Sequence, residues 1–108
     1  MNIKYIHQAN GFYFGFISNE SLFSRDGAYL GWVENDSSVW DKHGRYRGHI
    51  ITINNANYIF RPRFTVSPIP KVPKVEPVRP VLPQPAMNLM PIIIPLSHEE
   101  AFKNPNIS

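Results

Sequence analysis

The chain has 108 residues, a formal net charge of +3 and no cysteine, and 43% of its residues are hydrophobic. This length allows one domain and an appendage at most, and the lack of cysteine excludes a disulfide framework and thiolate zinc sites. The first ten residues lack the basic-then-apolar pattern of a signal peptide, and the aliphatic run at 92–94 is too short to span a bilayer, so we expect a cytoplasmic protein that does not enter a membrane.

A pattern of glycine, tyrosine, glycine and an aliphatic residue, each separated by one residue, occurs three times, at 11–17, 27–33 and 44–50. In each copy a polar residue precedes the first glycine, and Asn-Gly is the strongest short signal for a hairpin with a two-residue type I′ turn. Such a turn would place Ile6 opposite Gly15 and His7 opposite Phe14. A large aliphatic residue opposite glycine indicates that another part of the chain packs close to the bare backbone.

A fourth, degenerate copy at 55–62 keeps Tyr58 but has Ala56 and Phe60 in place of the two glycines. A turn at the same point of this copy would place Ile51 opposite Phe60. One hairpin alone is only marginally stable in water. Four hairpins that share an apolar face can bury that face around a common axis, so the sequence predicts an all-β domain of four hairpin repeats with pseudo-four-fold symmetry.

Side chains alternate between the two faces of a strand, and in the predicted register the aliphatic and tyrosine residues of the copies share one face. We expect this face to form the core, from Ile6, Tyr13, Leu22, Tyr29, Val39, Tyr46, Ile51 and Tyr58. The opposite face differs between copies, and in the first copy it carries Phe12, Phe14 and Phe16. An apolar patch of this kind marks an interaction site, so these three residues are a candidate assembly surface.

Seven prolines lie between residues 67 and 85, and between them aliphatic residues recur at every third position. Polyproline II has three residues per turn, so these aliphatic residues would line one edge of an extended rod. The stripe consists of Ile69 followed by Val72, Val75, Val78 and Val81. The sequence favours docking of this stripe over a free linker and makes its valines candidate assembly residues. It leaves open whether the tail docks on its own domain, on a neighbouring molecule, or projects freely.

The end of the chain is predicted to form a short helix. Ser97 would be the N-cap and Glu100 its capping-box partner. The expected organisation is therefore a four-hairpin domain at 1–66, an extended proline-rich segment at 67–96, and a short helical or frayed C-terminus at 97–108.

The repeats resemble those of a small bacterial family, the four-fold beta-flower proteins. The residues that carry the resemblance are Gly15-Phe-Ile17 after Asn10-Gly11, Asp26-Gly-x-Tyr-x-Gly-Trp-Val33, His43-Gly-x-Tyr-x-Gly-x-Ile50 and Asn57-Tyr-Ile-x-Arg61. The resemblance covers about residues 4–66 and implies hairpin petals around a pseudo-four-fold axis, followed by a proline-rich tail. It implies no activity, because the family has none that can be transferred.

No catalytic, cofactor-binding or metal-binding constellation is predicted. The histidines have neither a helical i, i+4 partner nor a cysteine companion, and the serines lie outside any nucleophile-elbow context. The third copy and the strand after it do combine an aromatic ring with cations, as single-strand binders do. This candidate anion or nucleic-acid site consists of Trp40, Arg45, Arg47, His49 and Arg61. In the predicted register Trp40 also faces Arg47 as a cation–π pair.

The sequence therefore favours a non-enzymatic structural or interaction module without a cofactor. Such a module would form a homo-oligomer, or bind a protein partner, through its variable hairpin faces and its proline-rich tail. The alternative is an anion or single-stranded nucleic-acid binder that uses the basic third hairpin.

Overall fold

The computed structural model describes residues 3–35, 37–63 and 68–102, and all regular structure in these ranges is β. The predicted domain boundary at residue 66 and the last six residues of the predicted C-terminal segment lie outside these ranges. Seven strands follow one another as an antiparallel meander, and an eighth strand pairs with the seventh. The strands are β1 (Ile3–His7), β2 (Tyr13–Ser18), β3 (Ser21–Ser24), β4 (Tyr29–Glu34), β5 (Ser38–Asp41), β6 (Tyr46–Ile53), β7 (Ala56–Pro62) and β8 (His98–Glu100).

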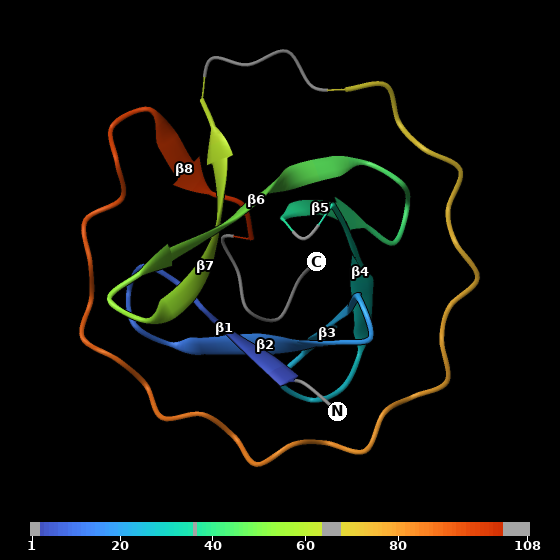
Figure 1. The fold of residues 1–108 in the computed structure, drawn as a ribbon, viewed down its shortest axis with the longest axis horizontal. Helices are drawn as coiled ribbons and strands as arrows, with labels where there is room; N and C mark the ends of the chain where they lie inside the picture. The colour runs from blue at the N-terminus through green and yellow to red at the C-terminus, as the bar shows by residue number, and fades with distance from the viewer. Residues whose placement is uncertain (1–2, 36, 64–67, 103–108) are drawn as a thin grey trace.

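The meander closes on itself, because β1 also pairs in parallel with β7 (Figure 1). Only two residue pairs make this closure, Ile6 with Asn57 and His7 with Tyr58, whereas β1 pairs with β2 along its whole length. The result is a closed, barrel-like sheet of seven strands, which confirms the predicted all-β class.

The turns that carry the first glycine of each copy are not the predicted two-residue type I′ turns. The Gly11 N–H donates to the Gln8 carbonyl at 2.8 Å, and the Gln8 N–H donates to the Phe12 carbonyl at 2.9 Å. Gly11 has a φ of 93°, and Asn10 is not among the residues with positive φ. This is the type I turn followed by a left-handed glycine that forms a G1 bulge. The same hydrogen bonds occur at Gly27 and Gly44.

The bulge changes which side chains share a face. His7 lies opposite Tyr13 and not Phe14, while Ile6 keeps its predicted place opposite Gly15. The extra residue between these two pairs turns the tyrosine to the face opposite the aliphatic residue, because a shift of one residue exchanges the faces of a strand.

The fourth copy has a different turn from the one predicted. Asn54 and Asn55 both have positive φ, 52° and 67°, and form a two-residue turn that places Ile51 opposite Tyr58, not Phe60. The prediction was wrong because it required a left-handed alanine, whereas asparagine tolerates that conformation better.

The second glycine of each copy lies against a neighbouring backbone, as the sequence predicted. A Cβ on Gly31 would be 1.9 Å from the Trp40 carbonyl oxygen, closer than any side chain can approach. The equivalent distances are 2.1 Å from the Phe23 oxygen at Gly15 and 2.5 Å from the Phe60 oxygen at Gly48.

The core contains three of the four predicted aliphatic residues, Ile6, Leu22 and Val39, whereas Ile51 is only half-buried and none of the tyrosines belongs to the central cluster. Because of the bulge, the residue after each tyrosine points inward instead. Tyr29 and Tyr46 pack in two separate aromatic clusters outside the centre. The central cluster consists of Ile6, Phe14, Ile17, Leu22, Leu30, Val33, Val39, Ile59, Ala101 and Phe102.

The predicted C-terminal helix is wrong for the residues described, because β8 occupies its start. β8 pairs antiparallel with β7, with Glu100 opposite Phe60. The Ser97 hydroxyl contacts the His98 imidazole at 2.8 Å and does not cap a helix. The free edge of β7 supplies main-chain hydrogen-bond partners, and these hydrogen bonds outweigh a weak local preference for helix. After β8 the chain turns inward, and Phe102 is buried in the core.

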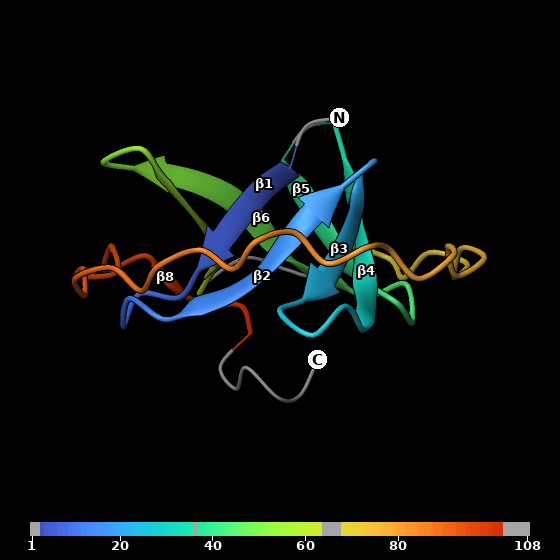
Figure 2. The same ribbon diagram turned by 90° about the horizontal axis from the view of Figure 1, so that it is seen from below.

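The proline-rich segment encircles the barrel. We call residues 68–97 the belt. In Figure 1 the belt runs around the outside of the strands, from the yellow segment to the red β8, and Figure 2 shows it crossing the molecule at about half its height. The whole molecule measures 36 × 35 × 24 Å, so it is a disc with the belt at its edge.

Candidate interaction surface

The belt is held to the barrel by the turns that carry the first glycines. The Lys71 N–H donates to the Gly44 carbonyl and the Leu89 N–H donates to the Gly11 carbonyl, both at 2.7 Å. A Cβ on either glycine would lie 1.8 Å from a belt carbonyl oxygen. These glycines therefore adopt the left-handed turn conformation and also leave the space in which the belt passes.

The belt meets the three glycine turns in succession. Lys71 lies at the Gly44 turn, Arg79 at the Gly27 turn and Leu89 at the Gly11 turn. At the polyproline rise of about 3.1 Å per residue, Lys71 to His98 covers roughly 84 Å, which is about three quarters of the circumference of a disc 36 Å across. Pro80 has no N–H to donate, and close to it the Arg79 guanidinium donates to the Asp26 carbonyl at 2.7 Å.

Lysines at the start of the belt lie over the tryptophans of the second and third copies. The Lys71 ammonium is 4.6 Å from the centre of the Trp40 ring, and the Lys74 ammonium is 5.3 Å from that of Trp32. Lys71 and the Trp32 indole N–H both donate to the Glu34 carboxylate. These hydrogen bonds, with Lys71 first, lower the pKa of Glu34 below its usual value. Each cation–π contact at such exposed sites contributes about 0.5–1 kcal/mol.

Two side chains of β1 hold the later part of the belt. The Tyr5 hydroxyl donates to the Gln84 carbonyl at 2.7 Å. The His7 imidazole is buried, and its Nε2 lies 2.9 Å from the Met87 carbonyl oxygen. Because a carbonyl only accepts, Nε2 carries the proton, and Nδ1 has no hydrogen-bond partner in the part of the chain that the structure describes.

These contacts turn the aliphatic stripe outward, so the proline-rich segment docks on its own barrel, but not by its aliphatic stripe. The inward row of the belt contains Pro77, Pro80, Pro83 and Ala86, which are half-buried. We call the outward row the rim. Nine of its ten residues are apolar, and these nine are 84–94% exposed. The rim consists of Ile69, Val72, Val75, Val78, Val81, Gln84, Met87, Met90, Ile93 and Leu96.

The phenylalanine surface predicted for assembly does not exist as a patch. Phe14 and Phe16 are buried, with exposed fractions of 1% and 0%, and only Phe12 is exposed. Phe14 faces the core because of the G1 bulge, and Phe16 stacks on Phe23 at 5.4 Å between ring centres. Of the predicted assembly residues, Phe12 and the four valines remain accessible.

The residues of the predicted anion or nucleic-acid site do not form one exposed surface. Trp40 is 6% exposed, lies opposite Tyr46 and packs under a belt lysine, so its ring is not free to stack on a base. The Tyr46 hydroxyl and the His49 imidazole are 2.6 Å apart, and Arg61 is half-buried on β7. Arg45 is the most exposed cation of the set, with 68% of its side chain accessible.

Arg47 has a role that the repeat pattern did not reveal. It occupies the position that is Phe14 or Leu30 in the other copies, and it points toward the C-terminal segment. Its guanidinium lies 4.3 Å from the centre of the Phe102 ring, donates to the Ala101 carbonyl at 2.9 Å and pairs with Asp41 at 3.4 Å. The predicted Trp40 partner is therefore wrong. A cation at an apolar position of a repeat was the signal in the sequence.

Glu100 makes the attachment of β8 sensitive to pH. Burial raises the pKa of Glu100 to about 7, although a hydrogen bond from the Ala9 N–H opposes the shift. The pKa of the neighbouring Tyr58 is raised by burial and, to a smaller extent, by the ionised Glu100 carboxylate. The pKa of Glu100 is higher in the folded than in the unfolded chain. The stabilising contribution of the protonated Glu100 carboxyl is therefore fully present below about pH 4.5 and is lost as the pH rises from there through about 7.

We therefore expect the free energy of unfolding to fall by about 1–2 kcal/mol between pH 5 and pH 8, a value reduced for the water that still reaches the carboxyl. Urea unfolding at the two pH values measures this difference. Glu100→Gln should remove most of it, whereas Glu99→Gln on the same strand should leave it unchanged. An equal pH dependence in the wild type and Glu100→Gln would contradict the assignment.

The described residues contain no cluster of three or more histidine, cysteine or acidic side chains arranged to bind a metal. Within the same part of the chain no helix has the length and apolar character needed to cross a membrane.

Comparison with known proteins gives one match. No curated protein and no solved structure matches the chain. Residues 1–97 match the family described as 4-fold beta flower protein. This match covers the hairpins and the belt up to the start of β8, and it confirms the family that the repeat pattern resembles. The chain therefore belongs to the 4-fold beta flower protein family.

Proposed function

We propose that this protein is a non-enzymatic assembly module that associates with copies of itself through the rim. The observation that carries the proposal is the outward row of nine apolar side chains, which the contacts of the inward row hold away from the barrel. Monomeric proteins rarely expose contiguous apolar surface of this extent, and such surfaces mark interaction sites.

The shape of the rim indicates the kind of assembly. The rim is convex and follows the edge of the disc (Figure 1), so one contact between two discs covers only a few side chains. Several neighbours can dock around the same edge, because the apolar positions continue along the whole belt. Contacts that do not close into a ring produce open-ended assemblies. We therefore expect lateral association whose average mass rises with concentration, and not a single tight dimer.

Light scattering on the full chain tests the proposal. The variant Val75→Ser/Val78→Ser/Val81→Ser removes three adjacent rim side chains. If one contact buries two valines, at about 1.5 kcal/mol each, their loss weakens association by roughly a hundredfold. We expect the mass of the wild type to rise with concentration and that of the variant to stay near the monomer.

The matched control is Glu76→Ser, which changes an exposed belt residue outside the rim. Circular dichroism should be the same for all three proteins, since none of the changed side chains is buried. A wild type that stays monomeric at every concentration would overturn self-association, and so would a triple variant that associates as the wild type does.

We also propose that β7 and β8 form the fourth petal of a pseudo-four-fold repeat, with the belt as an extended polyproline connection in place of the short glycine turn. In each of the other three hairpins a tyrosine lies opposite the aromatic ring of the preceding strand. In the pair of β7 and β8, Glu100 takes the place of the tyrosine and lies opposite Phe60. The Phe60 carbonyl also approaches Gly48 as the Phe23 carbonyl approaches Gly15.

A further inference from the structure

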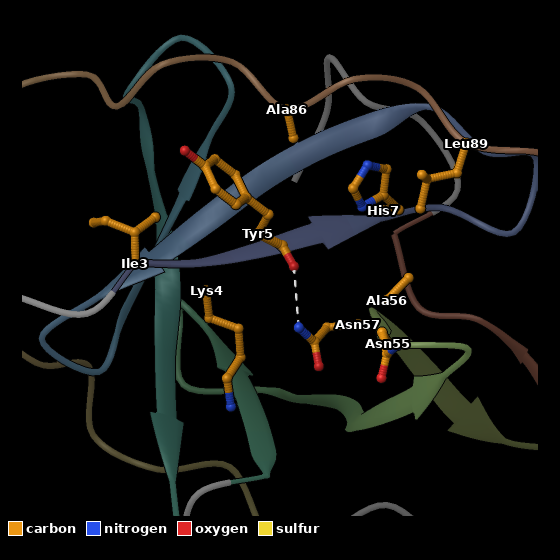
Figure 3. A pocket seen from close by; sticks show the side chains of 9 residues that line it. All are labelled: Ile3, Lys4, Tyr5, His7, Asn55, Ala56, Asn57, Ala86 and Leu89. Atoms are coloured by element: carbon orange, nitrogen blue, oxygen red, sulfur yellow. Dashed lines mark hydrogen bonds between the residues drawn. The ribbon is translucent and has the colours of Figure 1, made fainter.

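The barrel has a gap at its closure. The strands that follow the glycine turns, β2, β4 and β6, have six, six and eight residues, whereas β8 has three. Beyond the end of β8, β1 and β7 pair directly with each other at two residue pairs only. Among the residues that the structure describes, the first half of β1, residues 3–5, therefore has no paired strand on its β7 side, and the hairpin of β6 and β7 diverges from it (Figure 3).

A pocket of about 440 Å³ occupies this gap, which we call the seam. One wall is the first half of β1, the other is the start of β7, and the belt closes the outer side (Figure 3). The pocket is lined by Ile3, Lys4, Tyr5, His7, Asn55, Ala56, Asn57, Ala86 and Leu89.

The main chain of β1 presents hydrogen-bonding groups to the seam. The Tyr5 carbonyl faces it, because that oxygen accepts a hydrogen bond from the Asn57 side-chain amide at 3.5 Å (Figure 3). In a strand, the N–H and C=O of one residue point to the same side, and alternate residues share that side. The N–H of Tyr5 and the main chain of Ile3 therefore face the seam as well, and an uncovered strand edge is a template for pairing with another chain.

The seam is also positively charged. None of its nine lining residues is acidic. The Lys4 ammonium forms no ion pair or hydrogen bond with any residue that the structure describes. Figure 3 shows the Lys4 side chain directed into the space between the two walls. The wall also contains the buried His7 imidazole, whose Nδ1 is a hydrogen-bond acceptor without a partner within the described ranges.

We propose that the seam binds an extended, acidic segment of a partner protein, which adds as a short strand antiparallel to β1. Main-chain hydrogen bonds to the Ile3–Tyr5 edge would supply affinity, as in other strand-addition complexes. The acidic side chain of the segment pairs with Lys4, and its apolar side chains contact Ala56 and Leu89. The segment takes the place in the sheet that the short β8 leaves open.

The probe is a short peptide with capped ends in which valine and glutamate alternate, titrated into the full chain. Nuclear magnetic resonance should show shifts of the backbone amides of Ile3, Lys4, Tyr5 and Asn57, and slower exchange of the Tyr5 amide with solvent. Slower exchange reports a main-chain hydrogen bond, which a ligand held only by side chains would not produce. A peptide in which lysine replaces glutamate should bind about three- to tenfold more weakly.

Two matched changes make the result specific. Lys4→Glu should reverse the preference, so that the lysine peptide binds more tightly, while Lys42→Glu, at an exposed turn residue after β5, should leave the preference unchanged. The glutamate peptide with N-methylated amides should no longer slow the exchange of Tyr5. Equal binding of the two peptides, shifts confined to the rim, or no shifts at the seam at millimolar peptide would each overturn the proposal.

Discussion

Gly31→Ala should cost the barrel about 3 kcal/mol of its free energy of unfolding, because overpacking costs about 1–3 kcal/mol and rigid neighbours place this site at the upper end of that range. The new Cβ would lie 1.9 Å from the Trp40 carbonyl oxygen and 2.7 Å from the Asp41 Cα. Both obstacles belong to the backbone of β5, so no rotamer change can relieve the contact. β4 and β5 would have to separate, and their ladder pairs from Gly31 to Glu34 would be strained. Urea unfolding followed by circular dichroism measures the loss.

Gly27→Ala is the matched control. Its nearest obstacle is the Leu82 Cδ2 atom at 2.9 Å, the end of a flexible side chain, and its φ of 87° adds backbone strain. We expect a loss of about 1–2 kcal/mol from the left-handed conformation alone. If Gly31→Ala is no more destabilising than Gly27→Ala, the close approach of β5 does not explain why glycine occupies position 31.

Asp41→Ala should be the most damaging single change of a polar residue, with a loss of about 3–4 kcal/mol. Asp41 is buried and accepts hydrogen bonds from the His43 and Arg45 N–H groups at 2.9 and 3.0 Å, which hold the third glycine turn. It also pairs with Arg47, whose side chain is 23% exposed. Removing one partner of such a pair leaves the other charge poorly compensated, and two unsatisfied turn N–H groups add to the cost.

Asp41→Asn separates these two contributions. The amide oxygen can still accept the turn hydrogen bonds, but the charge that faces Arg47 is lost. We expect about half of the loss seen in Asp41→Ala. Arg47→Met removes the cation, so adding Asp41→Asn to this variant should lower its free energy of unfolding only slightly. If Asn and Ala at position 41 destabilise equally in the wild type, the turn hydrogen bonds make no net contribution.

The sequence predicted the features that depend on local pattern. Three copies of the glycine motif gave the hairpins, the pairing of Ile6 with Gly15 and the close approach to the second glycine, because alternation along a strand is a short-range property. The threefold period of the proline-rich segment, with its stripe of valines at the same interval, was also readable. Family membership followed from the same residues.

Side-chain direction around the turns could not be read in the same way. A type I′ turn and a type I turn with a G1 bulge both accept a polar residue followed by glycine, yet they differ by one residue in register. That one residue moved Tyr13 out of the core and Phe14 into it, and it removed the predicted phenylalanine surface. The polar residue and the glycine alone therefore do not select between the two turns.

Long-range contacts decided the rest. The belt docks by its proline row and not by its stripe of valines, because the main-chain N–H groups of Lys71 and Leu89 bind the carbonyls of the Gly44 and Gly11 turns. Residues 98–100 form the strand β8 because they pair with the edge of β7. The capping pattern at Ser97 is a local signal and cannot reveal this distant partner. The sequence by itself determined the repeat and its hairpins, since these arise between near neighbours. The tertiary structure decided which faces are buried, since burial depends on which distant segments meet.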